Sequence, residues 1–410
     1  NLNCLAVLKA ALKVTCHGQT VEVRALTEAG ESLLPSLEER FHHRLVSRET
    51  TTVVFEFSLS THPDERERLL AESTADILRF LQLEANYSSP LLPFLGGGFA
   101  YDYLATFEEL PEVKPGANTY PDYEFLVAQT VLAVDHLQGT AHLEGWDIDD
   151  KRLREELDSL ASLPAAARPA APQRERIRAV ADVDDTGFRA DVDKLKSNIH
   201  AGDIYQVVPA RAFTVDCPNA LAAYRALRET NPSPYMFYVR GADYELFGAS
   251  PESNLKFTPE DRQVQLYPIA GTRPRGLNPD GSINHELDIR NELDMRTDHK
   301  EIAEHTMLVD LARNDLARVA VPRSRQVAEL LHVDRYSRVM HLVSRVTATL
   351  HPDFDALVAY RACMNMGTLT GAPKLRATEL VRRTEGKRRG SYGGAVGYLR
   401  GDGAMDNCIV

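Results

Sequence analysis

Apolar and polar residues alternate in two stretches near the start of the chain, residues 13 to 26 and 52 to 58. Both are enriched in β-branched residues, so the pattern predicts β-strands. Residues 124 to 145 resemble another pair of strands. Between 64 and 86 the apolar positions fall near helical spacing, which predicts a helix followed by a turn. Three glycines at 96 to 98 favour a bulge or a tight strand entry over a phosphate loop, because no lysine follows at the required spacing.

The second half of the chain opens with an amphipathic helix. Asp185 or Thr186 can cap it, apolar residues recur every three or four positions, and a glycine ends it. Before this helix, prolines interleaved with alanines predict a stiff, exposed linker over 164 to 183. We therefore expect an N-terminal region at 1 to 163 and a separate domain at 184 to 410. Further strands are expected at 204 to 213, 236 to 240, 245 to 248 and 263 to 269, and helices at 298 to 318, 353 to 364 and 373 to 384.

Charge and composition narrow the classes of function. With 47 Lys+Arg against 59 Asp+Glu the net charge is −12, and a chain without a basic tail gains nothing from counterion release on nucleic acid. The sequence contains no run of about 18 apolar residues, the length that a helix needs to cross a bilayer, and no signal peptide is evident at its start. The five cysteines are far apart and odd in number, which fits neither a disulfide framework nor a zinc ribbon. We expect a cytoplasmic protein that binds neither nucleic acid nor membranes.

The acidic segment at 286 to 304 is the densest chemical signal. Glu301 and Glu304 are three residues apart, so both lie on one face of a helix and can approach one hard cation. The alternative is a solvated acidic face. His305 and the apolar run at 308 to 311 instead suggest a helix largely embedded in protein, where carboxylates need a compensating cation.

Three glycine-rich segments place small residues beside hydroxyls and cations, at 268 to 276, 365 to 374 and 388 to 398. Such a composition can line a small polar pocket for carboxylates, although each segment alone is more often a turn. The second is not a Walker motif, because Lys374 follows Pro373 and no Ser or Thr comes after it.

His341 lies among apolar neighbours. A lone histidine in such a place is usually a satisfied core residue, so its interpretation depends on the residues around it.

Eight segments, taken in order, closely resemble the chorismate-binding enzymes, and among them the large, chorismate-utilising subunit of anthranilate synthase. The resemblance is strong in the second half of the chain and weak in the first, where it rests chiefly on 95 to 103. The eight segments are 203 to 211, 231 to 238, 247 to 257, 268 to 276, 292 to 319, 333 to 344, 365 to 377 and 388 to 398.

The resemblance implies an α+β fold, an α/β sandwich of two mainly antiparallel sheets packed face to face with helices outside. Residues 184 to 410 would form the chorismate-binding catalytic domain and 1 to 163 a regulatory or structural region. The implied enzyme is a lyase that uses Mg²⁺ to convert chorismate and ammonia into anthranilate and pyruvate. This is the first committed step of tryptophan biosynthesis, and tryptophan inhibits it.

The resemblance also assigns roles to single residues. Glu304 matches a magnesium ligand, and Glu301 would assist it through water. Glu252 matches the acid that protonates the departing C4 hydroxyl. His341 matches the histidine of proton transfer during pyruvate loss, and Thr368 a catalytic and substrate-holding residue. Substrate contacts are also implied for Gln206, Gly271, Thr272 and Tyr392, and an allosteric tryptophan pocket for Pro234, Tyr235, Met236, Val396 and Tyr398.

Two positions discriminate between nucleophiles within the family. Gln206 stands where hydrolytic relatives carry a water-activating lysine, and Ala270 where others carry a nucleophilic lysine. Ammonia is therefore the expected nucleophile, supplied by a separate glutamine amidotransferase subunit. Aminodeoxychorismate synthase, 2-amino-2-deoxyisochorismate synthase and a non-catalytic tryptophan-binding regulatory subunit are the alternatives. The family's remaining metal carboxylates would follow Val410 and its LLES motif would precede Asn1, so we expect both ends to be trimmed.

Overall fold

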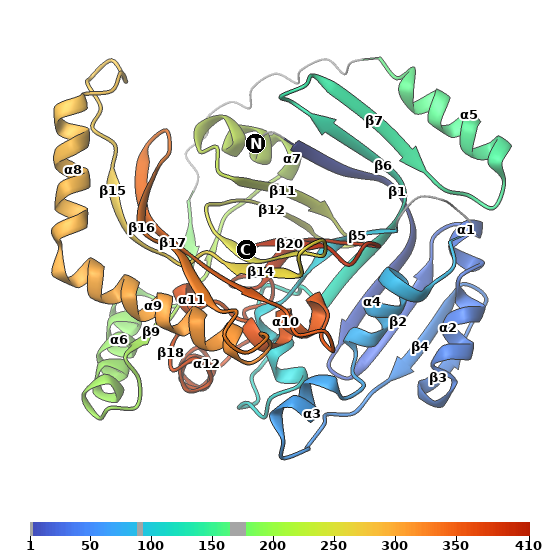
Figure 1. The fold of residues 1–410 in the computed structure, drawn as a ribbon, viewed down its shortest axis with the longest axis horizontal. Coiled ribbons are helices and arrows are strands. Elements are labelled where there is room, and N and C mark those ends of the chain that lie inside the picture. The colour runs from blue at the N-terminus through green and yellow to red at the C-terminus, as the bar shows by residue number, and fades with distance from the viewer. Residues whose placement is uncertain (1–2, 88–92, 165–177) are drawn as a thin grey trace.

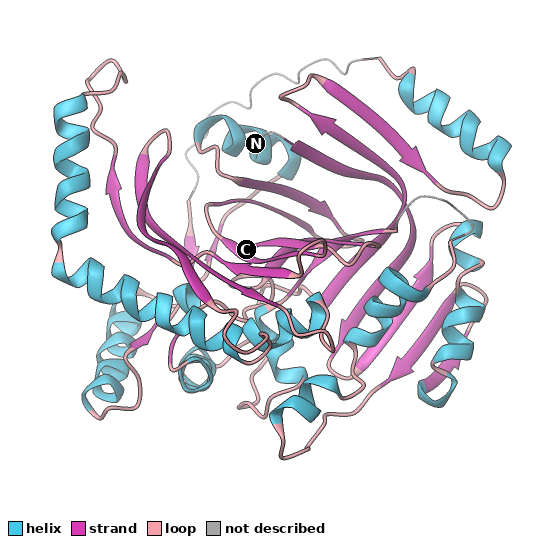
Figure 2. Ribbon diagram, in the orientation of Figure 1, coloured by secondary structure: helices cyan, strands magenta, loops and turns pink. Residues whose placement is uncertain are grey.

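The computed structural model describes residues 3–87, 93–164 and 178–410. Strands gather in the middle of the molecule, and helices lie around them (Figures 1 and 2). The strands of the largest sheet are β1 (Asn3–His17), β2 (Thr20–Ala25), β3 (Leu45–Arg48), β4 (Thr52–Glu56), β5 (Phe94–Phe99), β6 (Tyr123–Asp135), β7 (Thr140–Gly145), β13 (Ser253–Thr258), β14 (Gln263–Leu266), β15 (Ile269–Pro274), β16 (Gln326–Arg335), β17 (Val339–Thr349), β19 (Ala395–Arg400) and β20 (Met405–Ile409).

Three two-stranded sheets accompany it. They pair β8 (Val180–Ala181) with β10 (Phe213–Thr214), β11 (Tyr235–Arg240) with β12 (Glu245–Ser250), and β9 (Gln206–Val207) with β18 (Gly371–Ala372). The helices are α1 (Glu28–Glu31), α2 (Leu34–Arg40), α3 (Glu65–Leu70), α4 (Ala75–Arg79), α5 (Asp150–Ala161), α6 (Asp185–His200), α7 (Ala220–Thr230), α8 (His285–Thr297), α9 (His299–Ala317), α10 (Ala356–Cys363), α11 (Gly367–Thr370) and α12 (Lys374–Glu385), with the short helical segments η1 (His42–Arg44), η2 (Phe80–Glu84) and η3 (Tyr101–Thr106).

The large sheet is antiparallel and crosses from one half of the chain to the other. Its strand order is β15-β17-β14-β13-β20-β19-β5-β6-β1-β2-β4-β3, with β16 added on β17 and β7 on β6. The α+β class predicted from the sequence is confirmed. Where two packed sheets were expected, hydrogen bonding joins the described strands of both halves into one path, because β5 of the first half pairs with β19 of the second.

Glycines make this junction between β5 and β19 possible. Gly97 faces Gly397 across the ladder, and a Cβ at Gly97 would overlap the Glu124 carbonyl of β6, while one at Gly98 would overlap the Ala395 carbonyl. Close approach of neighbouring backbones is a known reason for glycine within a strand. The expected bulge is absent, since 96 to 98 pair in regular register with both neighbouring strands.

One hydrophobic cluster spans both halves of the chain. Phe99 stacks on Tyr360 of α10 with ring centroids 4.3 Å apart and on Tyr103 at 5.3 Å, and such aromatic pairs add to the energy of burial. The two-domain division stays a prediction, and residues 165 to 177 of the expected linker lie outside the described residues. No helix in the described ranges combines the length and the apolar surface that a bilayer crossing needs.

Two local predictions from the sequence are wrong. The helix expected over 64 to 86 is split into α3 and α4. The Ser73 amide and hydroxyl both donate to the Asp76 carboxylate, at 2.7 and 3.2 Å, and such local bonds compete with the helical ladder. The strand expected over 204 to 213 shrinks to the short β9 and β10 at its two ends.

Candidate active site

Strand β15, which carries the Pro-Ile-Ala-Gly-Thr-Arg-Pro motif, contacts several of the predicted site residues. The Ile269 amide donates to Glu252 Oε1 at 3.4 Å. Thr272 lies opposite His341 in the ladder with β17, and Thr272 Oγ1 is 2.8 Å from His341 Nδ1. The arginine that follows Thr272 binds Glu301. The strand therefore brings together the predicted acid, histidine and metal-binding helix.

Glu252 is buried just before β13, at the junction with β12. Its Oε1 accepts a hydrogen bond of 3.2 Å from the Thr368 hydroxyl as well as the bond from Ile269. Burial removes water from the carboxylate and raises the pKa of Glu252 to about 8, while these two hydrogen bonds act in the opposite direction. At neutral pH the carboxyl group is therefore mainly protonated and can donate a proton.

Helix α9 directs Glu301 and Glu304 toward the strands. Glu301 Oε1 accepts from Arg273 Nη1 at 3.1 Å, and Glu304 Oε2 is 2.6 Å from Lys300 Nζ. Both carboxylates are partly buried, whereas Glu286 of α8 is 83% exposed and pairs with Arg290 on its own helix. A solvated acidic side chain is therefore found at Glu286, whereas Asp288 on the same helix is buried and paired with Arg275.

Gln206 on β9 completes the surroundings of Glu304. Its Nε2 donates to Glu304 Oε1 at 2.8 Å, and its Oε1 is buried with no hydrogen-bond partner in the described part of the chain. The β9–β18 pairing holds it there: Gly371 has φ +125°, and a Cβ at that position would overlap the Gln206 carbonyl. A strand that close to β9 needs glycine at this point.

These oxygens suit one hard cation. Within the described ranges no group of three His, Cys, Asp or Glu side chains could hold a metal by itself. Mg²⁺, however, is commonly bound through one or two carboxylates together with water and substrate oxygens. Glu301, Glu304 and the unpartnered Oε1 of Gln206 fit that description.

His341 is half-buried and belongs to a small polar group. Besides Thr272, it faces Asp334 across the β16–β17 ladder, and the ring of Tyr336 lies 5.5 Å away. Desolvation lowers the pKa of His341, and the Asp334 charge opposes this. The neutral imidazole is therefore the main form near neutral pH, able to accept a proton. The interpretation as an ordinary core histidine is disfavoured, because its nearest polar partner is another predicted site residue.

Tyr392 is 42% exposed, and the Arg389 guanidinium lies 5.6 Å from its ring centroid. Arg389 donates to the carbonyls of Val208 and Leu369, at 2.7 and 2.8 Å. It thereby ties the segment of Gln206 to the segment of Thr368. Tyr392 lies over this junction.

The tryptophan pocket stays a prediction, and two of its residues, Tyr235 and Tyr398, are linked through strand β20. Tyr235 Oη donates to Asp406 Oδ1 at 3.1 Å, and Asp406 is the ladder partner of Tyr398. Val396 and Tyr398 are two residues apart on β19 and so share one face of the strand. Pro234 and Met236 flank Tyr235 in the sequence.

Sequence reasoning assigned no role in the site to two residues that hold it in place. Arg273 binds Asp294, Asp298 and Glu301 together. His305, which is fully buried, donates from Nδ1 to the Ala270 carbonyl at 2.9 Å and accepts at Nε2 from Ser344 Oγ at 2.7 Å. This tautomer follows because the carbonyl can only accept and burial, which lowers the pKa of His305, keeps the ring neutral. Both were visible in the motifs, but their partners are distant in sequence.

Comparison with known proteins identifies the enzyme family. Residues 37–410 match the family model described as chorismate binding enzyme, and the chain belongs to this family. Two relatives named anthranilate synthase component 1 are similar along its whole length. The protein of Vibrio parahaemolyticus is 50% identical over 100% of this chain and 77% of its own, and that of Escherichia coli 47% identical over 100% and 81%.

Solved structures agree. Anthranilate synthase component I from Streptococcus pneumoniae superimposes with a TM-score of 0.76 at 26% identity, covering 100% of this chain and 83% of its own. A menaquinone-specific isochorismate synthase from Escherichia coli shares the fold, with a TM-score of 0.61 at 17% identity over 99% and 83% of the two chains. The family resemblance predicted from the sequence is confirmed.

Proposed function

We propose that this chain is the large, chorismate-utilising subunit of an anthranilate synthase, a lyase that forms anthranilate and pyruvate from chorismate and ammonia. Relatives of that name, 47–50% identical over the full chain, support the function. The structural observation that carries the chemistry is Glu252, a buried carboxyl group with its pKa raised to about 8. An acid that keeps its proton at neutral pH is what loss of a hydroxyl group requires.

The mechanism distributes the steps over the chain's own residues. Glu252 would donate its proton to the C4 oxygen, so that the C4–O bond breaks and water leaves while ammonia forms the C–N bond at C2. Thr368 orients the carboxyl group through its 3.2 Å hydrogen bond. The C2 proton is then removed and pyruvate leaves as the ring becomes aromatic, with His341 as the group that moves protons.

Glu301, Glu304 and Gln206 would hold Mg²⁺, which when bound anchors the ring carboxylate and acidifies C2. Lys300 forms an ion pair with Oε2 of Glu304, and this ion pair would be replaced when the metal binds. Glycine is needed at position 271 beside this group, since its φ is +96°, a conformation that other residues rarely adopt, and a Cβ there would lie only 3.2 Å from the Cβ of Leu342. Gln206 has no basic atom with which to activate water, which favours ammonia as the nucleophile.

Ammonia would come from glutamine through a separate amidotransferase subunit. Tryptophan would bind at the wall formed by Tyr235, Met236 and Tyr398 and inhibit the reaction. The protein would work in the cytoplasm, at the first committed step of tryptophan biosynthesis.

Incubation with chorismate, Mg²⁺ and an ammonium salt at alkaline pH tests this function. Anthranilate is followed by fluorescence and pyruvate by a coupled dehydrogenase, and equal amounts of the two are expected without any partner protein. Isochorismate, salicylate or an aminated product that retains the enolpyruvyl group would overturn the proposal. The Glu252→Gln variant, which keeps the shape of the side chain but has no acidic proton, serves as the control.

A further inference from the structure

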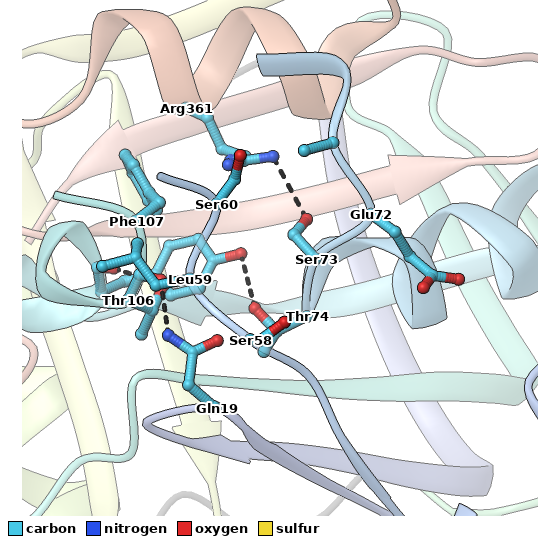
Figure 3. A pocket seen from close by; sticks show the side chains of 12 residues that line it. Gln19, Ser58, Leu59, Ser60, Glu72, Ser73, Thr74, Thr106, Phe107 and Arg361 are labelled. Carbon is cyan, nitrogen blue, oxygen red and sulfur yellow. Dashed lines mark hydrogen bonds between the residues drawn. The ribbon is translucent and has the colours of Figure 1, made fainter. Parts of the chain in front are cut away.

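A polar pocket lies between loops of the first half of the chain and helix α10, and it shares no residue with the candidate active site (Figure 3). Its wall combines the hydroxyl-bearing residues Ser58, Ser60, Ser73 and Thr106 with Arg361 of α10. In Figure 3 the Arg361 guanidinium donates to Ser73, and Ser60 is another residue of the same pocket wall. The pocket has room for about one water-sized group.

Arg361 is buried and incompletely satisfied. Only 5% of it is exposed, and Nε has no hydrogen-bond partner among the residues that the structure describes. Its two recorded hydrogen bonds both come from Nη1, at 3.2 Å to Ser73 Oγ and 3.4 Å to the Leu69 carbonyl. Arg361 forms no ion pair with any residue in the described part of the chain. A buried guanidinium without a counter-charge is costly, because no water compensates its charge.

The neighbouring carboxylates are already engaged with other cations. Asp76 and Asp355, whose charges reach Arg361, both pair with Arg79. Glu72 also lines the pocket, but its carboxylate binds Arg44 at 2.8 Å and His43 at 3.0 Å.

Phe107 lies against one face of the Arg361 guanidinium, 4.9 Å from ring centroid to Cζ. A cation–π contact compensates part of the charge, but it offers no acceptor to the N–H groups in the guanidinium plane. Burial accordingly lowers the pKa of Arg361. An acceptor with negative charge is missing at this point.

We propose that this pocket binds one small monovalent inorganic anion, chloride under ordinary conditions, through Arg361 and the surrounding hydroxyls. A monatomic anion fits the available room, whereas a phosphate or a carboxylate is larger than one water. Ser58 and Ser60 can turn their O–H groups toward it, since Ser58 has no side-chain hydrogen bond in the described residues and Ser60 Oγ only accepts from the His62 amide at 3.5 Å. The bound anion would neutralise the charge on the helix that leads into the Thr368 segment.

Anomalous scattering from bromide tests the site directly. Crystals of the protein grown without halide are soaked in sodium bromide, and an anomalous peak is expected in the pocket, within about 3.5 Å of the Arg361 nitrogens, a normal range for a halide that accepts N–H bonds. An ordered water with no bromide signal would overturn the proposal.

Thermal unfolding tests it in solution. Sodium methanesulfonate, whose anion is too large for the pocket, is replaced stepwise by sodium chloride at constant ionic strength. Wild type should gain roughly 1–2 °C in Tm along a saturating curve, and Arg361→Gln should lose that response. The control Arg383→Gln, which changes a 57% exposed arginine, should keep it.

A bromide peak without any chloride response in the wild-type protein would mean binding at crystal concentration only, and would refute the proposal. If Arg361→Gln fails to fold, the bromide peak and the wild-type chloride curve still decide. Neither measurement uses chorismate, so the outcome is independent of the proposed enzymatic function.

Discussion

Gln206 donates its side-chain amide to Glu304, with Nε2 and Oε1 2.8 Å apart, although 98 residues separate the two in the chain. The residue predicted to discriminate between nucleophiles therefore contacts the carboxylate predicted to bind the metal. The free Oε1 of Gln206 is left to accept a hydrogen bond or to join the coordination of a cation.

Replacing Gln206 by lysine puts a potential base beside Glu304. We expect only traces of an isochorismate-type product at low ammonia, with anthranilate still the main product. The ion pair with Glu304 keeps the lysine charged, and a base must be placed to within about 1 Å to act. Chromatography of the products measures the ratio, with Gln206→Met as a variant of similar length that lacks a base. Wild-type ratios in Gln206→Lys would mean that residue 206 is not near C2.

Replacing Glu304 by glutamine should remove metal binding and turnover together. We expect kcat/KM to fall about 100-fold, equivalent to ~2.7 kcal/mol of transition-state stabilisation. Glu301→Gln should cost about tenfold, because Arg273 shares its charge. Activity is measured against Mg²⁺ concentration, with the exposed Glu286→Gln as the control that changes nothing. Normal metal-dependent turnover in Glu304→Gln would contradict the assignment.

The raised pKa of Glu252 predicts how activity depends on pH. The protonated form is the active one, so at saturating free ammonia kcat/KM for chorismate should be level below the pKa and fall as pH rises through about 8. Thr368→Val removes a hydrogen bond that lowers this pKa. In the variant the fall of kcat/KM should therefore begin at a higher pH than in the wild type. A wild-type profile that is flat through pH 9 would show that Glu252 is not the proton donor.

Asp102 joins the two halves of the molecule. Its carboxylate binds Arg382 at 2.7 Å and the Gly390 amide at 2.9 Å, and the group is buried. Breaking a buried ion pair typically costs about 3–5 kcal/mol, so Asp102→Asn should lower the free energy of unfolding by that order in urea titrations. Asp193→Asn, at an exposed pair, should change it by less than about 0.5 kcal/mol. Equal stability of the two variants would argue against this bond as a tie between the halves.

Tryptophan should bind more weakly when its wall is altered. Met236→Thr removes apolar contact, and we expect roughly tenfold lower affinity by calorimetry, equivalent to about 1.4 kcal/mol. Chorismate with Mg²⁺ should weaken tryptophan binding by the same factor as tryptophan weakens chorismate binding. Unchanged tryptophan affinity in the variant, or the absence of any effect of one ligand on the affinity of the other, would mean that the pocket lies elsewhere.

Local chemistry was predictable from the sequence, and long-range pairing was not. The acidic helix pattern placed Glu301 and Glu304 on one face, and the motifs selected Glu252 and Thr368, which meet at 3.2 Å. The role of Arg273 depends on acids 21 to 28 residues away, and no periodicity shows such a contact.

The continuous sheet was equally hidden. Glycine at 97 predicts that another backbone approaches closely, but it does not say which strand approaches. Similarly, the unpaired charge of Arg361 appears only after the neighbouring carboxylates have found other partners in three dimensions.

Strand β20 connects Tyr235, in the predicted tryptophan pocket, with Glu252, the predicted proton donor. Asp406 receives the Tyr235 hydroxyl, and three residues later the Ile409 amide donates to the Glu252 carbonyl at 3.1 Å. Three residues of extended chain cover about 10 Å, so a ligand bound against Asp406 would be connected to the backbone of Glu252 through a single strand. Inhibition would then need no domain movement. Changes in β20 that touch neither ligand would make the enzyme insensitive to tryptophan while leaving its chemistry intact.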